Sequence, residues 1–263
     1  MKIDANSVTF EPQDMAFVKK FGILKATEMA LDYHAEHPNL PFLYDAEQLA
    51  GFLGISRGEL NDIVNHIQKE YKEAHLPKKN GTYRSLCVPS IRLRFCQDPI
   101  KEKILPQLPV SKFATAYQKG STTRGNAEPH IGKKFLLKLD ITDFFGSITF
   151  EQVQRTAFNT RYVSRQVGYL LTSLCCKDDS LPQGAATSPA LSNIVMYRFD
   201  DYIGRWCSQR QIAYTRYCDD MTFSANRPLY GVYQKVKTML REMGFELNES
   251  KTHFIGNDNR QSV

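Results

Sequence analysis

The chain has 263 residues, of which 42% are hydrophobic and 24% are charged, an ordinary composition for a folded globular protein. No apolar run approaches the roughly 18 residues needed to cross a membrane, and the N-terminus lacks the apolar core of a signal peptide. Six cysteines show no spacing typical of zinc ligands, so we expect reduced thiols and a cytoplasmic protein without a membrane partner.

The charge is distributed unevenly along the sequence, although the net charge is only +6. Residues 1–75 contain 7 basic and 12 acidic residues, residues 76–138 contain 13 basic and 3 acidic, and residues 139–263 are close to neutral. A basic block of this size is typical of proteins that bind a polyanion. Within it, residues 91–108 are predicted to form a helix with Arg92 and Arg94 on its polar side, as candidate RNA contacts.

Residues 1–75 are predicted to be mainly helical. Residues 45–60 have the pattern of a helix-turn-helix, with a capping box at Ser56 and Glu59. A recognition helix must approach phosphates, and this segment is acidic, so we interpret it as a structural brace rather than a DNA reader.

A β-hairpin is predicted around Asn80-Gly81, because this dipeptide lies between two short β-prone segments. The hairpin would carry Lys79 and Arg84 near its tip.

Three aspartates are predicted to converge. Residues 135–141 form a β-prone run that contains Asp140, and residues 211–224 are expected to form a hairpin with Asp219 and Asp220 at its tip. Adjacent carboxylates repel each other, and oxygen-rich sites of this kind suit Mg²⁺. A pair of such ions is the usual apparatus for in-line nucleotidyl transfer. The alternative, a surface turn that happens to carry two acids, stays open on these residues alone.

Helices are predicted between and after these strands. Residues 150–176 look helical, and Ser188-Pro189 is a typical start for a long helix. We expect its apolar stripe to be core; the stripe comprises Leu191, Ile194, Val195, Phe199, Tyr202, Ile203 and Trp206.

Four segments resemble, in the same order, motifs of reverse transcriptases. They are LDITDFF at 139–145, LPQGAATSP at 181–189, YCDD at 217–220 and GFELNESK at 244–251. Asn126-Ala-x-x-His130 further resembles an element of bacterial retron reverse transcriptases. The chain stops at Val263, where we expect the primer-grip hairpin and thumb of the family to begin.

This resemblance implies an α+β fold, with the fingers and palm of a right-hand polymerase and an antiparallel palm sheet. We expect an N-terminal helical segment at 1–75, fingers at 76–138, and a palm at 139–263 with inserted fingers helices at about 150–182.

The resemblance also implies roles for single residues. Two Mg²⁺ ions, for which Mn²⁺ can substitute, are expected on Asp140, Asp219, Asp220 and the backbone carbonyl of Ile141, with Lys251 as a general acid near the leaving pyrophosphate. The expected nucleotide-binding residues are Lys79 and Arg84 at the triphosphate, Asp143 and Phe145 at the sugar, and Gln183 and Gly184 beside the base and sugar. Asn126 and His130 are expected to have a structural and RNA-contacting role.

The expected function is RNA-templated DNA synthesis, with a structured non-coding RNA as template and primer, deoxynucleoside triphosphates as substrates and a DNA product. In retrons the product is RNA-linked single-stranded DNA that serves phage defence, in some cases with an effector protein. The alternatives are an intron-encoded, diversity-generating or abortive-infection reverse transcriptase, an RNA-dependent RNA polymerase, or a truncated polymerase that only holds RNA.

Overall fold

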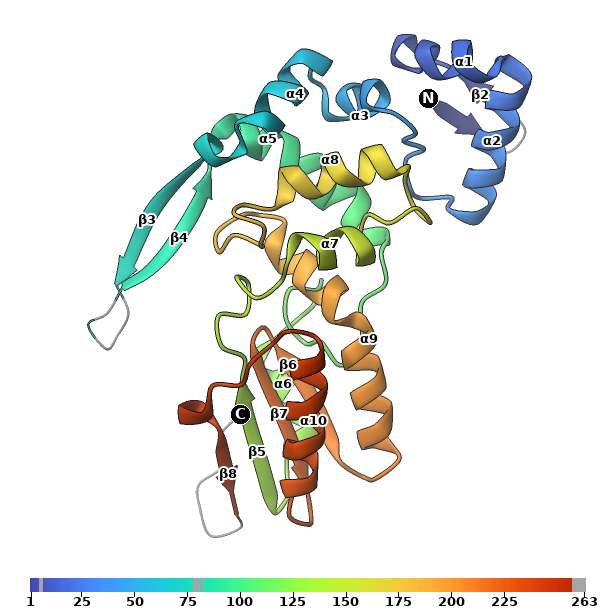
Figure 1. The fold of residues 1–263 in the computed structure, drawn as a ribbon. Coiled ribbons are helices and arrows are strands. Elements are labelled where there is room, and N and C mark those ends of the chain that lie inside the picture. Colours follow the sequence, from blue (N-terminus) through green and yellow to red (C-terminus); the bar gives the residue numbers. More distant parts are fainter. Residues whose placement is uncertain (5–6, 78–80, 82, 257–263) are drawn as a thin grey trace. The chain divides into compact units, whose positions relative to one another are not determined.

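The chain folds into two compact units, each built from two separate stretches of sequence (Figure 1). The computed structural model describes residues 1–4, 7–77, 81 and 83–256. The first unit comprises Met1–Leu108 and Thr149–Ser188, and the second comprises Pro109–Ile148 and Pro189–Val263. This division differs from the predicted boundaries at residues 75 and 138, because residues 109–138 pack with the second unit.

The first unit is mainly helical and contains two small hairpins. Its helices are α1 (Met15–Phe21), α2 (Ile23–Glu36), α3 (Ala46–Leu53), α4 (Arg57–Asn65), α5 (Ile91–Pro99), α7 (Phe150–Thr156) and α8 (Arg165–Cys175). Its strands are β1 (Lys2–Asp4), β2 (Ser7–Thr9), β3 (Tyr71–Pro77) and β4 (Tyr83–Pro89), paired as β1–β2 and β3–β4. Short 3-10 turns cover Pro12–Asp14, Ile67–Glu70 and Leu105–Gln107.

Local sequence signals explain several boundaries in this unit. The predicted capping box is present at the start of α4, where Ser56 and Glu59 each satisfy the other's backbone N–H. The predicted helix over 91–108 is α-helical only to Pro99 and continues as a π-helical turn, Ile100–Ile104. Proline has no N–H to donate, which favours such a break in the hydrogen-bond ladder.

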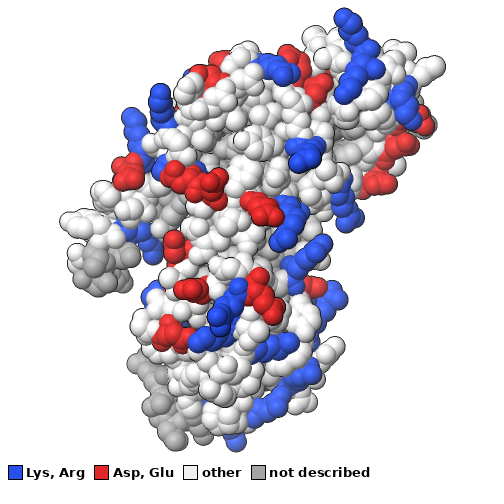
Figure 2. Space-filling view, in the orientation of Figure 1, with Lys and Arg blue, Asp and Glu red and all other residues white. Residues whose placement is uncertain are grey.

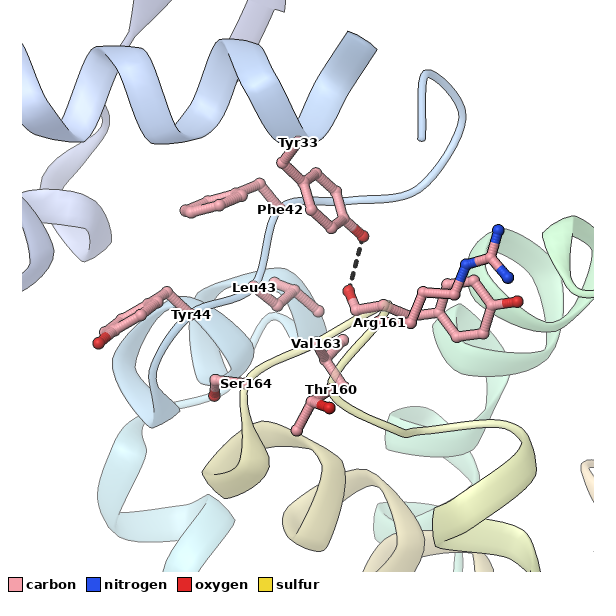
Figure 3. Close-up of a pocket in the computed structure, with 9 residues that line it drawn as sticks. Tyr33, Phe42, Leu43, Tyr44, Thr160, Arg161, Val163 and Ser164 are labelled. Atoms are coloured by element: carbon pink, nitrogen blue, oxygen red, sulfur yellow. Dashed lines mark hydrogen bonds between the residues drawn. The ribbon is translucent and has the colours of Figure 1, made fainter. Parts of the chain in front are cut away.

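The N-terminal helices are fastened to the rest of the first unit by a tyrosine (Figure 3). The hydroxyl of Tyr33, on α2, donates a hydrogen bond of 2.7 Å to the backbone carbonyl of Tyr162, in the loop between α7 and α8. Phe42 packs edge-on against the Tyr33 ring, with 5.3 Å between ring centroids. Helix α2 is therefore connected to the loop between α7 and α8 within the first unit.

The second unit is built on a four-stranded antiparallel sheet. Its strands are β5 (Phe135–Asp140), β6 (Ala213–Tyr217), β7 (Asp220–Ala225) and β8 (His253–Ile255), in the order β6-β7-β5-β8. Its helices are α6 (Thr123–Ala127), α9 (Ser188–Ser208) and α10 (Tyr230–Glu242), with 3-10 turns at Glu128–His130 and Glu249–Lys251. The predicted hairpin and the strand ending at Asp140 are confirmed.

The core stripe predicted on α9 is confirmed for its aliphatic members but wrong at its aromatic end. Leu191, Ile194 and Ile203 are buried, whereas Tyr202 is 49% exposed and Trp206 is only partly buried. Helical spacing alone does not distinguish a buried aromatic ring from one at the edge of the core, since Ile203 and Cys207 on the same stretch of the helix are fully buried.

His130 joins the segment before β5 to the sheet. Its Nδ1 lies 2.7 Å from the hydroxyl of Ser224 on β7, and its Nε2 lies 2.9 Å from the hydroxyl of Thr215 on β6. Each hydroxyl can donate or accept, so both ring nitrogens of a neutral imidazole are satisfied. Burial of the ring lowers the pKa of His130 to about 4.

This pKa predicts a pH-dependent loss of stability. Above pH 6.5 the ring is neutral in both states, whereas between pH 6.5 and 4 only the unfolded ring takes up a proton. Folding stability should therefore fall as the pH drops through this window, by up to about 3 kcal/mol from this group. Urea unfolding of the wild type and of His130→Gln, measured from pH 7.5 to 4, should give converging stabilities at low pH. His66→Gln, at an exposed ring, should retain the wild-type slope; a parallel offset between His130→Gln and the wild type would contradict the assignment.

Candidate active site

The three predicted carboxylates lie at one end of the second unit's sheet. Asp140 ends β5 and is directly opposite Asp220, the first residue of β7, in the antiparallel register. Asp219 precedes Asp220 in the turn, and its backbone carbonyl accepts a 3.1 Å hydrogen bond from the N–H of Ile141. Strand pairing and this extra bond bring together acids that are 79 residues apart in the sequence.

The acidic turn has a strained backbone. Tyr217 pairs with Asp220, which leaves Cys218 and Asp219 to reverse the chain. Cys218 has φ 59°, a left-handed value that residues other than glycine seldom adopt. Such strain persists only where the surroundings hold the backbone in place, and it is common at functional sites.

Lys251 supplies a positive charge to the acids. Its Nζ donates a 2.7 Å hydrogen bond to Oδ2 of Asp140, whose carboxylate is almost completely buried. This bond, and the charges of the three aspartates, raise the pKa of Lys251. The backbone N–H of Asn248 donates to the Asp140 carbonyl at 2.8 Å, and this contact anchors the turn that carries the lysine. The fold of the turn that carries Lys251 therefore places the ammonium group beside the Asp140 carboxylate.

The carboxylates act on one another electrostatically. Loss of hydration raises the pKa of Asp220, and the negative charges of Asp219 and Asp140 raise it further. Among the described residues, no three His, Cys, Asp or Glu side chains are already arranged to hold a metal ion. The donor set nevertheless suits a divalent cation, since three carboxylates at one end of the sheet supply the oxygen ligands that such an ion prefers; Lys251 would have to leave Asp140 for the ion to bind it.

A buried ion pair is connected to the acidic turn by a hydrogen bond. Arg216 and Asp200 are both fully buried, and the guanidinium donates from Nε at 3.0 Å and from a terminal nitrogen at 2.6 Å to the two carboxylate oxygens. The same guanidinium donates to the backbone carbonyl of Cys218 at 2.8 Å and to the Asn193 side chain at 3.0 Å. The hydroxyl of Tyr214 donates to Asp200 at 2.7 Å. Sequence patterns did not reveal this network, because Arg216 reads as an ordinary strand residue.

Two adjacent phenylalanines in the loop after Asp140 differ in their burial. Phe144 is buried, with the Arg216 guanidinium 5.7 Å from its ring centroid, whereas Phe145 is partly exposed. Asp143 has φ 42°, and a Cβ at Gly146 would collide with its carboxylate. A larger residue at 146 would therefore force the Asp143 carboxylate to turn away from its present position.

The other predicted nucleotide-binding residues belong to the first unit. Gly184 has φ 123°, and a Cβ there would lie only 2.9 Å from the carbonyl oxygen of Cys87 on β4. The Gln183 carbonyl accepts a 2.7 Å bond from the Cys87 N–H, which fixes the LPQG turn against this strand. Arg84 is exposed on β4, while Lys79 lies outside the described residues. Their grouping with the acids stays a prediction.

The predicted RNA-contacting residues have different surroundings. Arg94 is exposed, whereas exposed Arg92 is paired with Asp62 and lies 3.3 Å from Glu70. Those acids offset much of the charge of Arg92.

Asn126 and His130 of the Asn-Ala-x-x-His element both make side-chain hydrogen bonds within the second unit. The Asn126 side chain accepts a 2.6 Å bond from the hydroxyl of Thr115. Both ring nitrogens of His130 are bonded to hydroxyls of the sheet, which agrees with the expected structural role; the expected contact with RNA stays a prediction.

Comparisons with known proteins agree with the site. The family model described as reverse transcriptase (RNA-dependent DNA polymerase) matches residues 76–261. The retron Ec86 reverse transcriptase of Escherichia coli is 28% identical, over 91% of this chain and 76% of that protein. The retron Mx65 enzyme of Myxococcus xanthus is 32% identical (81% of this chain, 55% of that protein), and the E. coli retron Ec83 enzyme is 36% identical (65% and 58%).

The fold comparison points the same way. Telomerase from Candida albicans, solved with a fragment of telomeric RNA, superposes with a TM-score of 0.51 at 13% identity, over 74% of this chain and 44% of that one. At this identity the match concerns the fold alone, and it confirms the predicted α+β fold of the right-hand polymerase type. The chain spans little more than half the length of two of the three retron relatives.

Two neighbouring aspartates on α9 allow a test of the buried ion pair. Asp200→Asn should lower the free energy of unfolding by about 3–5 kcal/mol, because it leaves the Arg216 charge buried and unpaired. Asp201→Asn removes the partner of Arg205 from an exposed pair at 2.7 Å and should cost less than about 1 kcal/mol. Urea unfolding of the two variants measures the difference; equal losses would show that the buried pair does not hold this unit together.

Proposed function

Because this chain belongs to the reverse transcriptase family, we propose that it extends a DNA strand on an RNA template, as part of a retron-type enzyme. The observation that carries the proposal is the meeting of Asp140, Asp219 and Asp220 at the end of the second unit's sheet. A site with three acids and one lysine suits a reaction in which negative charge builds up on a phosphate.

Magnesium is the proposed cofactor, as two ions for which Mn²⁺ can substitute. The three aspartates and the Ile141 carbonyl would hold it. When bound, such ions lower the pKa of the attacking hydroxyl and neutralise charge on the transferred phosphate. Lys251 must first release Asp140, and it stays protonated at neutral pH because the ordinary pKa of a lysine amine is 10.5. A protonated Lys251 near the leaving pyrophosphate would then act as a general acid.

The incoming deoxynucleoside triphosphate would be bound by the residues that the family resemblance implies. Arg84 and Lys79 would neutralise the triphosphate, and Gln183 with Gly184 would border the base and sugar. The rigid attachment of the LPQG turn to β4 supports a common role for this turn and Arg84. Asp143 and the partly exposed ring of Phe145 would border the sugar.

The proposed partners are a structured non-coding RNA that supplies template and primer, the DNA product, and an effector protein that acts with them in phage defence. Asn126, His130, Arg92 and Arg94 remain proposed RNA-contacting residues. None of the helices in the described part of the chain is long and apolar enough to cross a membrane. A cytoplasmic location is also proposed.

A second candidate function is an RNA-holding scaffold that does not catalyse. The observation in its favour is the Lys251 ammonium, which takes the place on Asp140 that a metal ion would need. Metal-dependent extension of an annealed primer separates the two candidates.

Removing single acids tests the catalytic proposal. Asp140→Asn and Asp219→Asn should reduce Mg²⁺-dependent primer extension to background, since each removes a charged metal ligand, and should leave RNA affinity within about twofold of wild type. Asp32→Asn, at an exposed position on α2, is the matched control and should extend normally. Extension at the wild-type rate by either active-site variant would refute the assignment.

The choice of sugar provides a second test. Phe145→Val should raise the ratio of ribonucleotide to deoxynucleotide incorporation roughly tenfold or more, because a smaller side chain admits the 2′-hydroxyl. Phe144→Val should instead lower stability by about 1–3 kcal/mol, since Phe144 packs in the core. Single-nucleotide kcat/KM values with both sugars give the ratio. If only Phe144→Val raises the ratio of ribonucleotide to deoxynucleotide incorporation, then Phe144 rather than Phe145 borders the sugar.

A further inference from the structure

The outer side of α9 has aromatic rings that the core does not use. Tyr197, Tyr202 and Trp206 line a hollow of about 370 Å³ on this helix, and Tyr202 is 49% exposed. The opposite side of the helix, with Phe199 and Ile203, is buried in the second unit. Tyr197 and Trp206 are partly buried. Partly exposed aromatic rings around a hollow are typical of a binding surface, because a globular protein buries most of its large apolar groups.

Cations lie over these rings. The Arg210 guanidinium is 4.5 Å from the Trp206 ring centroid. The Lys235 ammonium, on α10, is 4.9 Å from the Tyr202 centroid and 5.4 Å from that of Trp206, and it donates to the Tyr202 hydroxyl at 3.1 Å. Figure 2 shows Lys and Arg side chains gathered along the side of the molecule where α9 and α10 lie in Figure 1.

The charge of these cations is not cancelled by acids. Among the described residues, no carboxylate pairs with Arg198, Arg210 or Lys235, whereas Arg205 is paired with Asp201. A ring face orients a cation but does not neutralise it, so the ammonium and guanidinium groups can still bind an anion. Other lysines differ in this respect: Lys237, also on α10, is paired with a carboxylate, that of Glu249, at 2.6 Å.

We propose that this surface of α9 and α10 binds single-stranded nucleic acid. Phosphates would bind Arg210 and Lys235, and a base would pack against Tyr202 and the edge of Trp206 in the hollow. The combination favours a nucleic acid over an acidic peptide, because a peptide carboxylate would satisfy the cations but leave the rings without a partner. The proposal rests on the proposed function only in that the chain acts on nucleic acid.

The partner is a single strand rather than a duplex. Bases in a duplex are stacked on one another and are not accessible to a ring on the protein surface, whereas an unpaired base can leave its neighbours. The surface belongs entirely to the second unit and is separate in sequence from the basic block at 76–138. It would hold unpaired RNA or DNA that is not at the acidic site.

Salt-dependent binding tests the cations. The affinity of a fluorescein-labelled 15-nucleotide oligo(U) would be measured by anisotropy between 50 and 300 mM KCl. Each phosphate contact on a single strand contributes about 0.7 to the slope of log K against log salt, so Arg210→Gln/Lys235→Gln should lower the slope by about 1.4. Lys237→Gln, from a paired lysine on the same helix, is the control and should change the slope by less than half of one contact.

Substitutions of Tyr202 test whether a base of the nucleic acid stacks on its ring. Tyr202→Ala should weaken oligo(U) binding by roughly 5- to 100-fold with the salt slope nearly unchanged, whereas Tyr202→Phe, which keeps the ring, should bind within about twofold of wild type. Thermal unfolding confirms that each variant is folded. Unchanged affinity and slope in both the charge and the ring variants would overturn the proposal, as would poly-glutamate binding as tightly as oligo(U).

The outcome is independent of catalysis. Extension of a short annealed primer would be measured on the same preparations. If wild-type protein does not extend the primer but the binding effects appear, only the proposed function fails. If wild-type protein extends the primer and the variants bind oligo(U) normally, only the α9–α10 surface fails.

Discussion

The buried ion pair between Arg216 and Asp200 is the interaction on which the second unit depends. Two charges removed from water cost several kcal/mol each, and good geometry must offset this cost. Here the guanidinium makes two bonds to the carboxylate, and its remaining donors reach Asn193 and the Cys218 carbonyl. A single side chain therefore connects strand β6, helix α9 and the acidic turn. If the pair opened, it would leave an unpaired charge in the core, so the three elements are held together in one arrangement.

This constraint explains how an acidic turn with a strained backbone can exist before any cation binds. Asp219 and Asp220 repel each other and Asp140, and Cys218 has a left-handed backbone. The hydrogen bond from Arg216 to the Cys218 carbonyl holds the backbone of the turn in place, while the Lys251 ammonium offsets the negative charge of Asp140. The scaffold thus provides the stability that the acidic site lacks, as expected where function requires like charges to be close.

The sequence predicted the parts of this site whose signals are local. A β-prone run located β5, alternating residues located β6 and β7, and the Asn-Gly pair located the β3–β4 hairpin, because strand and turn preferences act over a few residues. The partners of Arg216 could not be predicted, since burial of an arginine depends on an acid 16 residues away on a helix. The prediction that Tyr202 lies in the core is wrong for a related reason. Helical periodicity predicts on which face of the helix a residue lies, but it does not predict whether other elements cover that position.

Charge in three dimensions differs from charge along the sequence. Part of the basic surplus at 76–138 is cancelled where Arg92 meets Asp62, which comes from the acidic N-terminal segment. Residues 139–263 are nearly neutral in sum, yet their acids gather at the turn while unpaired cations gather over the rings of α9. The proposed metal ions and the proposed nucleic acid would need this separation within one unit, because mixed charges would neutralise each other. The near-neutral total of residues 139–263 therefore reflects separated charges rather than an uncharged surface.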